Sequence, residues 1–171
     1  MKYAADCENS GNIDAYFDNE HSDYGENFAS GIAIKLYGEE HSNERFAIER
    51  CKNTGNIKLE AKYIEKSLIS GSAGIIVSAT GKHEVDQCYN GGKIYNRGLS
   101  SIDIHDNYCG GIAGRADVTN CYNTAPIEVV VRNSDDTYAV GGIVGEGSAQ
   151  NCYNIGSINV NALNGYDDIS V

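Results

Sequence analysis

The sequence predicts an all-β fold, a β-solenoid (β-helix) of about five stacked coils, with roughly three short strands and variable loops in each coil. Three observations support this prediction. A phrase that begins with cysteine recurs five times, apolar and polar residues alternate after it, and 20 glycines and 12 tyrosines accompany a single proline in 171 residues. Such a composition favours many tight turns between short strands. The length suits one domain with a sizeable core.

The cysteine phrase marks the beginning of each unit. Its five copies start at Cys7, Cys51, Cys88, Cys121 and Cys152. The spacings between these cysteines are 44, 37, 33 and 31 residues, so the unit shortens toward the C-terminus. We therefore expect one repeat domain over residues 1–171. The phase of the repeat at both ends leads us to expect a fragment of a longer array.

A second phrase, rich in glycine and isoleucine, lies between the cysteine phrases. It occupies residues 30–34, 73–77, 110–114 and 141–145. An apolar residue also stands three positions before each later cysteine, at Ile48, Val85, Val118 and Ala149. Phrases that repeat in a fixed order at this period are the signature of stacked repeat architectures.

Residues 57–61 and 158–162 alternate between apolar and polar types directly after the phrase. A period of two predicts a strand with one buried face. The Asn-x-Gly step before each strand is expected to form a corner, because asparagine and glycine tolerate positive φ. A single unit cannot bury its apolar face, whereas stacked units share a continuous core.

Stacking predicts interior ladders of matching residues about 4.8 Å apart. The predicted core ladders consist of the cysteines Cys7, Cys51, Cys88, Cys121 and Cys152 and the isoleucines Ile13, Ile57, Ile94, Ile127 and Ile158. A β-propeller is the alternative at this repeat length, but units of 31 and 33 residues are short for four-stranded blades.

The two phrases resemble the GLUG-motif repeats of bacterial cell-surface proteins. Residues 142–145 and 111–114 match the Gly-Leu-x-Gly-like phrase best, followed by Asn-Cys-Tyr-Asn at 151–154 and 120–123. The first two units depart from this pattern, since Ile34 and Val77 replace the closing glycine and Glu8 and Lys52 replace the tyrosine. Such repeats occur in secreted adhesin-like proteins and in the non-catalytic part of IgA-specific metalloendopeptidases. The resemblance implies an extracellular or cell-surface setting and transfers no catalytic residues.

The charge and hydropathy exclude several classes of partner. A formal net charge of −11 disfavours nucleic acid and anionic membrane surfaces. No apolar run approaches the length of a membrane span, so we expect no membrane insertion. A host or cell-surface protein or glycan remains a candidate partner, as does self-association through the open ends of the solenoid.

No residue pattern predicts catalysis or a bound cofactor. The cysteines are expected to pack as free thiols, with disulfides as the alternative. No Cys-x-x-Cys pair suggests zinc, and the four histidines, all in expected loops, form no His-Glu-x-x-His motif. Calcium is an alternative at loop acids that recur after the cysteines: Asp103, Asp135, Asp136, Asp167 and Asp168. Solvated acids are the preferred interpretation, so no metal ligand is assigned.

The clearest candidate contact surface consists of Tyr89, Tyr122 and Tyr153, each directly after a motif cysteine. Alternation places these rings opposite the buried cysteines, in an outward column that either contacts a ligand or packs laterally over the backbone. We therefore predict a non-catalytic extracellular repeat module that acts as an adhesive or spacer scaffold. The alternative is a carbohydrate-binding or carbohydrate-cleaving β-solenoid.

Overall fold

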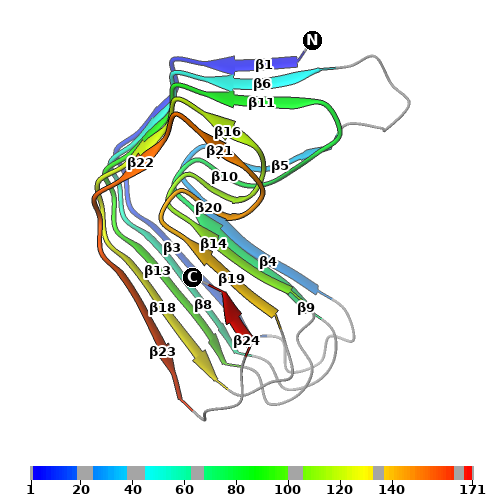
Figure 1. Ribbon diagram of the computed structural model, residues 1–171. Coiled ribbons are helices and arrows are strands. Elements are labelled where there is room, and N and C mark those ends of the chain that lie inside the picture. The colour runs from blue at the N-terminus through cyan, green and yellow to red at the C-terminus, as the bar shows by residue number, and fades with distance from the viewer. Residues whose placement is uncertain are drawn as a thin grey trace.

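The computed structural model describes residues 2–18, 25–37, 45–62, 68–99, 106–132, 137–163 and 168–170. Within these residues the chain forms 24 strands and no helix. The strands wind into five stacked coils, which confirms the predicted all-β solenoid (Figure 1). A complete coil contains five strand segments, two more than predicted, because two-residue strands form beside the corners.

The first coil contains β1 (Lys2–Ala5), β2 (Glu8–Asn9), β3 (Ile13–Asp18), β4 (Gly25–Ser30) and β5 (Ala33–Tyr37). The second contains β6 (Phe46–Glu49), β7 (Lys52–Asn53), β8 (Ile57–Lys62), β9 (Leu68–Ala73) and β10 (Ile76–Thr80). The third contains β11 (His83–Asp86), β12 (Tyr89–Asn90), β13 (Ile94–Leu99), β14 (Asp106–Gly110) and β15 (Ala113–Arg115). The fourth contains β16 (Val118–Thr119), β17 (Tyr122–Asn123), β18 (Ile127–Arg132), β19 (Thr137–Gly141) and β20 (Val144–Glu146). The fifth contains β21 (Ala149–Gln150), β22 (Tyr153–Asn154), β23 (Ile158–Ala162) and β24 (Asp168–Ser170).

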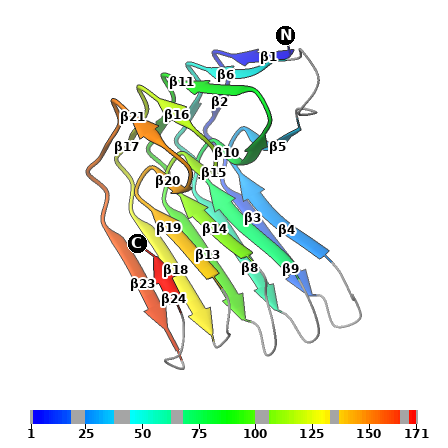
Figure 2. The same ribbon diagram turned by 45° about the vertical axis from the view of Figure 1, so that its right-hand side comes forward.

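Equivalent strands of successive coils form five parallel sheets, whose layering is clearest in the rotated view (Figure 2). Sheet A contains β1, β6, β11, β16 and β21, and sheet B contains β2, β7, β12, β17 and β22. Sheet C contains β3, β8, β13, β18 and β23, and sheet D contains β4, β9, β14, β19 and β24. Sheet E contains β5, β10, β15 and β20.

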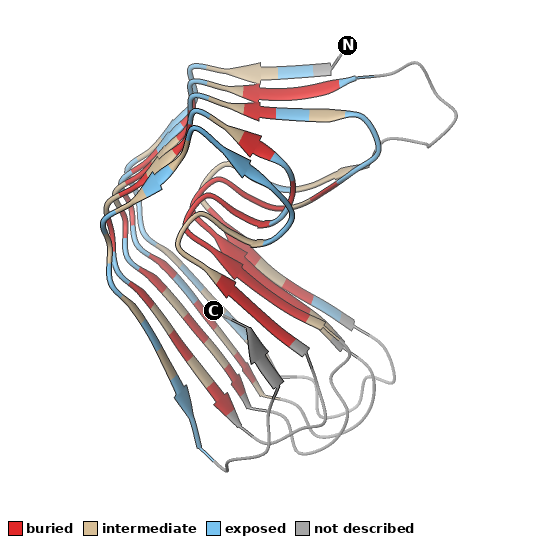
Figure 3. Ribbon diagram, in the orientation of Figure 1, coloured by how far each residue is buried: buried red, intermediate tan, exposed pale blue. Residues whose placement is uncertain are grey.

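The apolar core consists of two clusters. Side chains of sheets A and E form one cluster together with the motif cysteines, and side chains of sheets C and D form the other. Figure 3 shows buried segments concentrated in the middle coils. The isoleucines at the start of sheet C follow this pattern: Ile57, Ile94 and Ile127 are at most 1% exposed, whereas the equivalent residues of the outer coils are only partly buried. Full burial of one such side chain contributes about 1.5–3 kcal/mol.

Each isoleucine lies opposite its counterpart in the next coil. The pairs are Ile13 with Ile57, Ile57 with Ile94, Ile94 with Ile127, and Ile127 with Ile158. The register along sheet C therefore equals the cysteine spacing of the sequence.

A ladder of asparagines runs through the interior beside the isoleucines. It consists of Asn9, Asn53, Asn90, Asn123 and Asn154. In the middle of the ladder, Asn53 Nδ2 donates to Asn90 Oδ1 at 2.7 Å and Asn90 Nδ2 donates to Asn123 Oδ1 at 2.8 Å. Asn90 Nδ2 also donates to the Gly92 carbonyl oxygen at 2.9 Å. Buried amides of this kind are tolerated because their hydrogen bonds are satisfied.

The corner chemistry differs from the prediction. The asparagines of the Asn-x-Gly step do not adopt positive φ; they point inward and form the ladder. Positive φ occurs instead directly before the motif cysteine, at Asp6, Arg50, Gln87, Asn120 and Asn151, with φ between 51° and 54°. Close stacking favours glycine at the end of the step in the second coil, because a Cβ on Gly55 would collide with the carbonyl oxygen of Gly11.

Candidate binding surfaces

The outer face of sheet B carries the three predicted tyrosines in a column. Tyr89 lies opposite Tyr122, and Tyr122 lies opposite Tyr153. The ring centroids of Tyr89 and Tyr122 are 4.6 Å apart with an interplanar angle of 30°, and those of Tyr122 and Tyr153 are 5.2 Å apart at 12°. Aromatic pairs at these separations stabilise the structure by more than the burial of their apolar area alone. We call these three residues the tyrosine column.

The tyrosine column is held by a hydrogen bond at Tyr89 and is exposed at Tyr153. The hydroxyl of Tyr89 shares a hydrogen bond of 3.0 Å with Thr124 Oγ1 of the next coil. A Cβ on Gly91 would collide with the Tyr89 hydroxyl, so glycine leaves room for this ring. Tyr89 and Tyr122 are half-buried, whereas Tyr153 is 53% exposed. The column is thus half-buried in the third and fourth coils and presents ring surface in the fifth.

Charged residues replace the rings in the first two coils. Glu8 lies opposite Lys52, which lies opposite Tyr89. The Lys52 Nζ and Glu8 Oε1 atoms are 3.2 Å apart, and both side chains are about half exposed. The aromatic part of this face is therefore confined to the last three coils.

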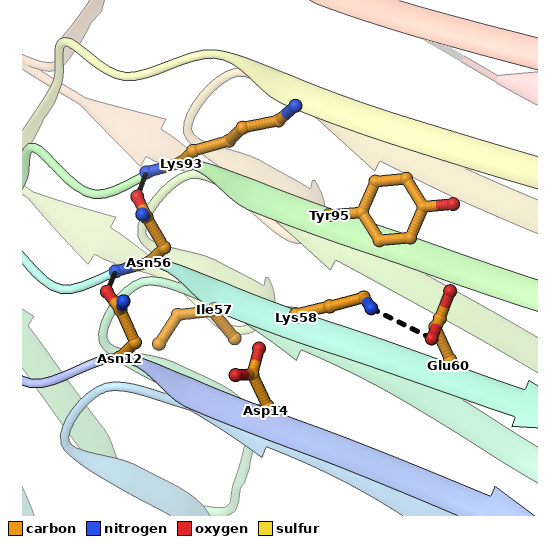
Figure 4. A pocket seen from close by; sticks show the side chains of 8 residues that line it. All are labelled: Asn12, Asp14, Asn56, Ile57, Lys58, Glu60, Lys93 and Tyr95. Atoms are coloured by element: carbon orange, nitrogen blue, oxygen red, sulfur yellow. Dashed lines mark hydrogen bonds and ion pairs between the residues drawn. The ribbon is translucent and has the colours of Figure 1, made fainter.

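A shallow groove on the outer face of sheet C forms a second candidate surface, which the sequence analysis did not predict. The groove has a volume of about 430 Å³ and is formed by the first three coils. Its lining residues are Asn12, Asp14, Asn56, Ile57, Lys58, Glu60, Lys93 and Tyr95 (Figure 4). Residue alternation in β3, β8 and β13 could have indicated which side chains face outward, but their combination into a groove depends on the register of three coils.

Two kinds of contact organise this groove. At one wall, Asn12 Oδ1 accepts the N–H of Asn56 at 3.0 Å, and Asn56 Oδ1 accepts the N–H of Lys93 at 3.0 Å (Figure 4). Across the floor, Lys58 Nζ lies 3.0 Å from Glu60 Oε2. This hydrogen bond and the charge of Glu60 raise the pKa of Lys58, so the ammonium stays charged at neutral pH.

The motif cysteines of the three middle coils are buried in the core, whereas those of the two outer coils are not. Cys51, Cys88 and Cys121 are at most 1% exposed, Cys152 is half-buried and Cys7 is exposed. All are free thiols, as is Cys109 in β14. The backbone N–H of Cys88 donates to Cys121 Sγ at 3.3 Å, and Cys88 Sγ donates to the Asp86 carbonyl oxygen at 3.3 Å.

His83 has a structural role. The prediction placed it in a loop, but it begins β11. Its Nε2 accepts the N–H of Asp117 at 3.0 Å, so Nδ1 carries the proton and donates to the Gly81 carbonyl oxygen at 2.9 Å. Both ring nitrogens of the neutral imidazole are therefore occupied. His21, His41 and His105 lie outside the described residues.

The side chains of the predicted loop acids are not among those that the structure describes. Asp103, Asp135, Asp136 and Asp167 lie outside the described residues, and of Asp168 only the backbone, in β24, is described. Among the residues that are described, no group of three or more His, Cys, Asp or Glu side chains could hold a metal ion. The calcium alternative therefore stays a prediction.

Comparison with known proteins gives no relative: no family model, no curated protein and no solved structure matches this chain. In the described part of the chain, no helix has the length and apolar character needed to cross a membrane.

Proposed function

We propose that this chain is a non-catalytic repeat module of a bacterial surface protein, serving outside the cell as an adhesive or spacer scaffold. The observation that carries the proposal is the unbroken parallel register of the coils, which extends through all five sheets. Each added coil lengthens such a stack by about 4.8 Å, and each coil contacts only its neighbours. The module therefore combines reach with a regular outer surface.

The chemistry of the described residues agrees with a non-catalytic role. The motif thiols serve as packing groups, and both nitrogens of His83 hold backbone atoms. The net charge of −11 suits a solvated protein that avoids anionic membranes and nucleic acid. The resemblance of residues 111–114 and 142–145 to GLUG-motif repeats supports the extracellular setting.

The tyrosine column is the proposed recognition surface of this scaffold. Its rings are held in fixed positions by stacking and by the Tyr89–Thr124 hydrogen bond, so a partner would meet a preorganised surface. Tyrosine suits such a role, because one side chain offers a flat apolar ring and a hydroxyl.

An array of immobilised glycans and extracellular proteins tests this proposal. Binding to the array is compared between the wild type and a variant with three substitutions: Tyr89→Ser, Tyr122→Ser and Tyr153→Ser. We expect the variant to lose binding of the retained protein ligand while its circular dichroism stays unchanged. Undiminished binding would contradict the role of the column. Release of reducing sugars from any glycan on the array would contradict the non-catalytic assignment.

A further inference from the structure

We infer that the outer face of sheet C in the first three coils binds a short neutral oligosaccharide. Tyr16 and Tyr95 are the stacking platforms, and the Lys58–Glu60 ion pair between them is the hydrogen-bonding centre. This site, which we call the sheet C site, is separate from the tyrosine column and goes beyond the scaffold role.

The register of sheet C places the two rings diagonally across the ion pair. Tyr95 of the third coil lies opposite Lys58 of the second, and Tyr16 of the first coil lies opposite Glu60 of the second. The two tyrosines are therefore separated by two coil spacings and by one two-residue step along the strand. These offsets correspond to about 12 Å between their backbone positions. Two platforms at this separation suit an oligosaccharide better than a single sugar.

The two rings provide apolar surface on a polar face. Tyr16 is 64% exposed, and Tyr95 is half-buried at the wall of the groove in Figure 4. The face of an aromatic ring is electron-rich, so it attracts the slightly positive C–H groups on one face of a sugar ring. Tyr16 also lines a smaller hollow with Glu60 and Arg97, which continues the groove across the second coil.

The polar groups of the sheet C site alternate between donors and acceptors. The ammonium of Lys58 and the side-chain amides of Asn12 and Asn56 donate, whereas the carboxylates of Asp14 and Glu60 accept. Sugar hydroxyls both donate and accept, so this mixture complements them.

The charges of the site favour a neutral ligand. The two lysines of the groove, Lys58 and Lys93, balance its two acids, Asp14 and Glu60. Both lysines are already engaged, Lys58 with Glu60 and Lys93 with Glu128 at 2.5 Å. An anionic glycan would compete with these carboxylates and would approach a chain whose net charge is −11.

The same face in the last two coils lacks both platforms and supplies an internal control. Glu128 and Asn159 continue the column of Tyr95, while Val130 and Asn161 continue the next column. Asn159 is exposed and belongs to the same strand ladder, so its replacement tests whether any outward change on sheet C affects binding.

The test uses an array of neutral, sialylated and sulfated oligosaccharides, followed by calorimetric titration of the best neutral ligand. We expect the wild type to retain neutral glycans. Loss of either ring, in Tyr16→Ser or Tyr95→Ser, should weaken binding about threefold to tenfold. Tyr95→Phe should retain most of the affinity, because it keeps the ring. Asn159→Ala should bind like the wild type.

Three outcomes would overturn the inference: no retention of neutral glycans, a preference for charged glycans, or affinities that neither tyrosine substitution changes. The variant lacking the tyrosine column separates this inference from the proposed scaffold function. It should still bind the neutral ligand at the sheet C site, and loss of that ligand from this variant alone would assign the sugar to the column instead.

Discussion

The first two coils and the last three contribute strands to the same stacked sheets but carry different outer side chains. On sheet B, the first two coils pair Glu8 with Lys52, whereas the later coils stack three tyrosines. On sheet C the outward rings, Tyr16 and Tyr95, belong to the first and third coils, and the last two coils carry none. The inner ladders and the sheet hydrogen bonds maintain the stack, so outer columns can differ from coil to coil. Each face can therefore acquire its own binding chemistry.

The corner between sheets D and E shows how a departure from the repeat is compensated. The third coil has Tyr108 and, six residues later, the closing glycine Gly114; the second coil has Gly71 and, six residues later, Val77. A Cβ on Gly71 would lie 2.7 Å from Val77 Cγ1, and one on Gly114 would lie 2.7 Å from the Val77 carbonyl oxygen of the neighbouring coil and 3.2 Å from Tyr108 Cβ. The large and the small residue have exchanged places. The missing closing glycine of the second unit is thus explained by packing within the same coil.

The largest expected effect concerns a feature that both regions share, the asparagine ladder. Asn90→Ala removes the hydrogen bonds to Asn123 and Gly92 and leaves one N–H of the buried Asn53 amide without its acceptor, while the other still donates to the Gly55 carbonyl oxygen. We expect a loss of about 3 kcal/mol in the free energy of unfolding, measured by urea denaturation. Asn9→Ala, at the half-buried N-terminal end of the ladder, is the matched control and should cost clearly less. Equal losses at both positions would show that burial does not determine the contribution of the ladder.

The exchange of large and small residues at the corner can be tested directly. Gly71→Ala should destabilise the protein by about 2 kcal/mol, because the new methyl group overlaps Val77. In a double-mutant cycle, Val77→Ala should recover part of this loss, with a coupling of about 1 kcal/mol. Strictly additive effects in urea unfolding would disprove the compensation.

Thiol reactivity separates the outer coils from the middle ones. Iodoacetamide should modify Cys7 rapidly in the folded protein, whereas Cys51, Cys88 and Cys121 should react only in urea. Cys109 is a control outside the motif, since burial raises the pKa of its thiol to about 12 and keeps it protonated. Peptide mass spectrometry after timed labelling measures each rate. Rapid labelling of the middle thiols would contradict the buried ladder.

The smallest expected effect concerns the pKa values of two aspartates, each of which accepts hydrogen bonds from the next coil. The hydrogen-bonded guanidinium of Arg50 lowers the pKa of Asp6, whereas the hydroxyl and N–H of Ser148 lower the pKa of Asp117. Because both pKa values are depressed, each carboxylate stabilises the fold above its ordinary pKa, and this contribution is lost as the pH falls through the folded value.

The pKa values of Asp6 and Asp117 should respond differently to salt. Raising the ionic strength to 0.5 M screens the exposed Asp6–Arg50 pair, so the pKa of Asp6 should move toward its ordinary value. The pKa of Asp117 should change less, because the neutral donors of Ser148 are the main cause of its depression, and Ser148→Ala should raise it at any ionic strength. NMR titration of the two carboxyl groups measures both shifts. Equal salt responses would show that net charge, rather than the local partner, controls these values.

The order and phase of the solenoid can be predicted from the amino-acid sequence alone. Two phrases in fixed order identify the repeat, and cysteine spacings of 44, 37, 33 and 31 residues equal the offsets with which Ile13, Ile57, Ile94, Ile127 and Ile158 pair. The outward direction of the tyrosines also follows from period-two alternation. These features can be predicted because, in a parallel stack in register, residues separated by one repeat length lie side by side in neighbouring coils.

The stacking of the coils determines which polar residues lie in the interior and which outer residues combine into a groove. An asparagine beside a glycine predicts an exposed corner, yet Asn90 is fully buried because the coils above and below supply its hydrogen-bonding partners. The groove on sheet C likewise combines side chains from three coils, including Asp14, Lys58 and Tyr95. Such properties depend on atoms that come together only when the coils stack, so no single segment of the sequence contains them.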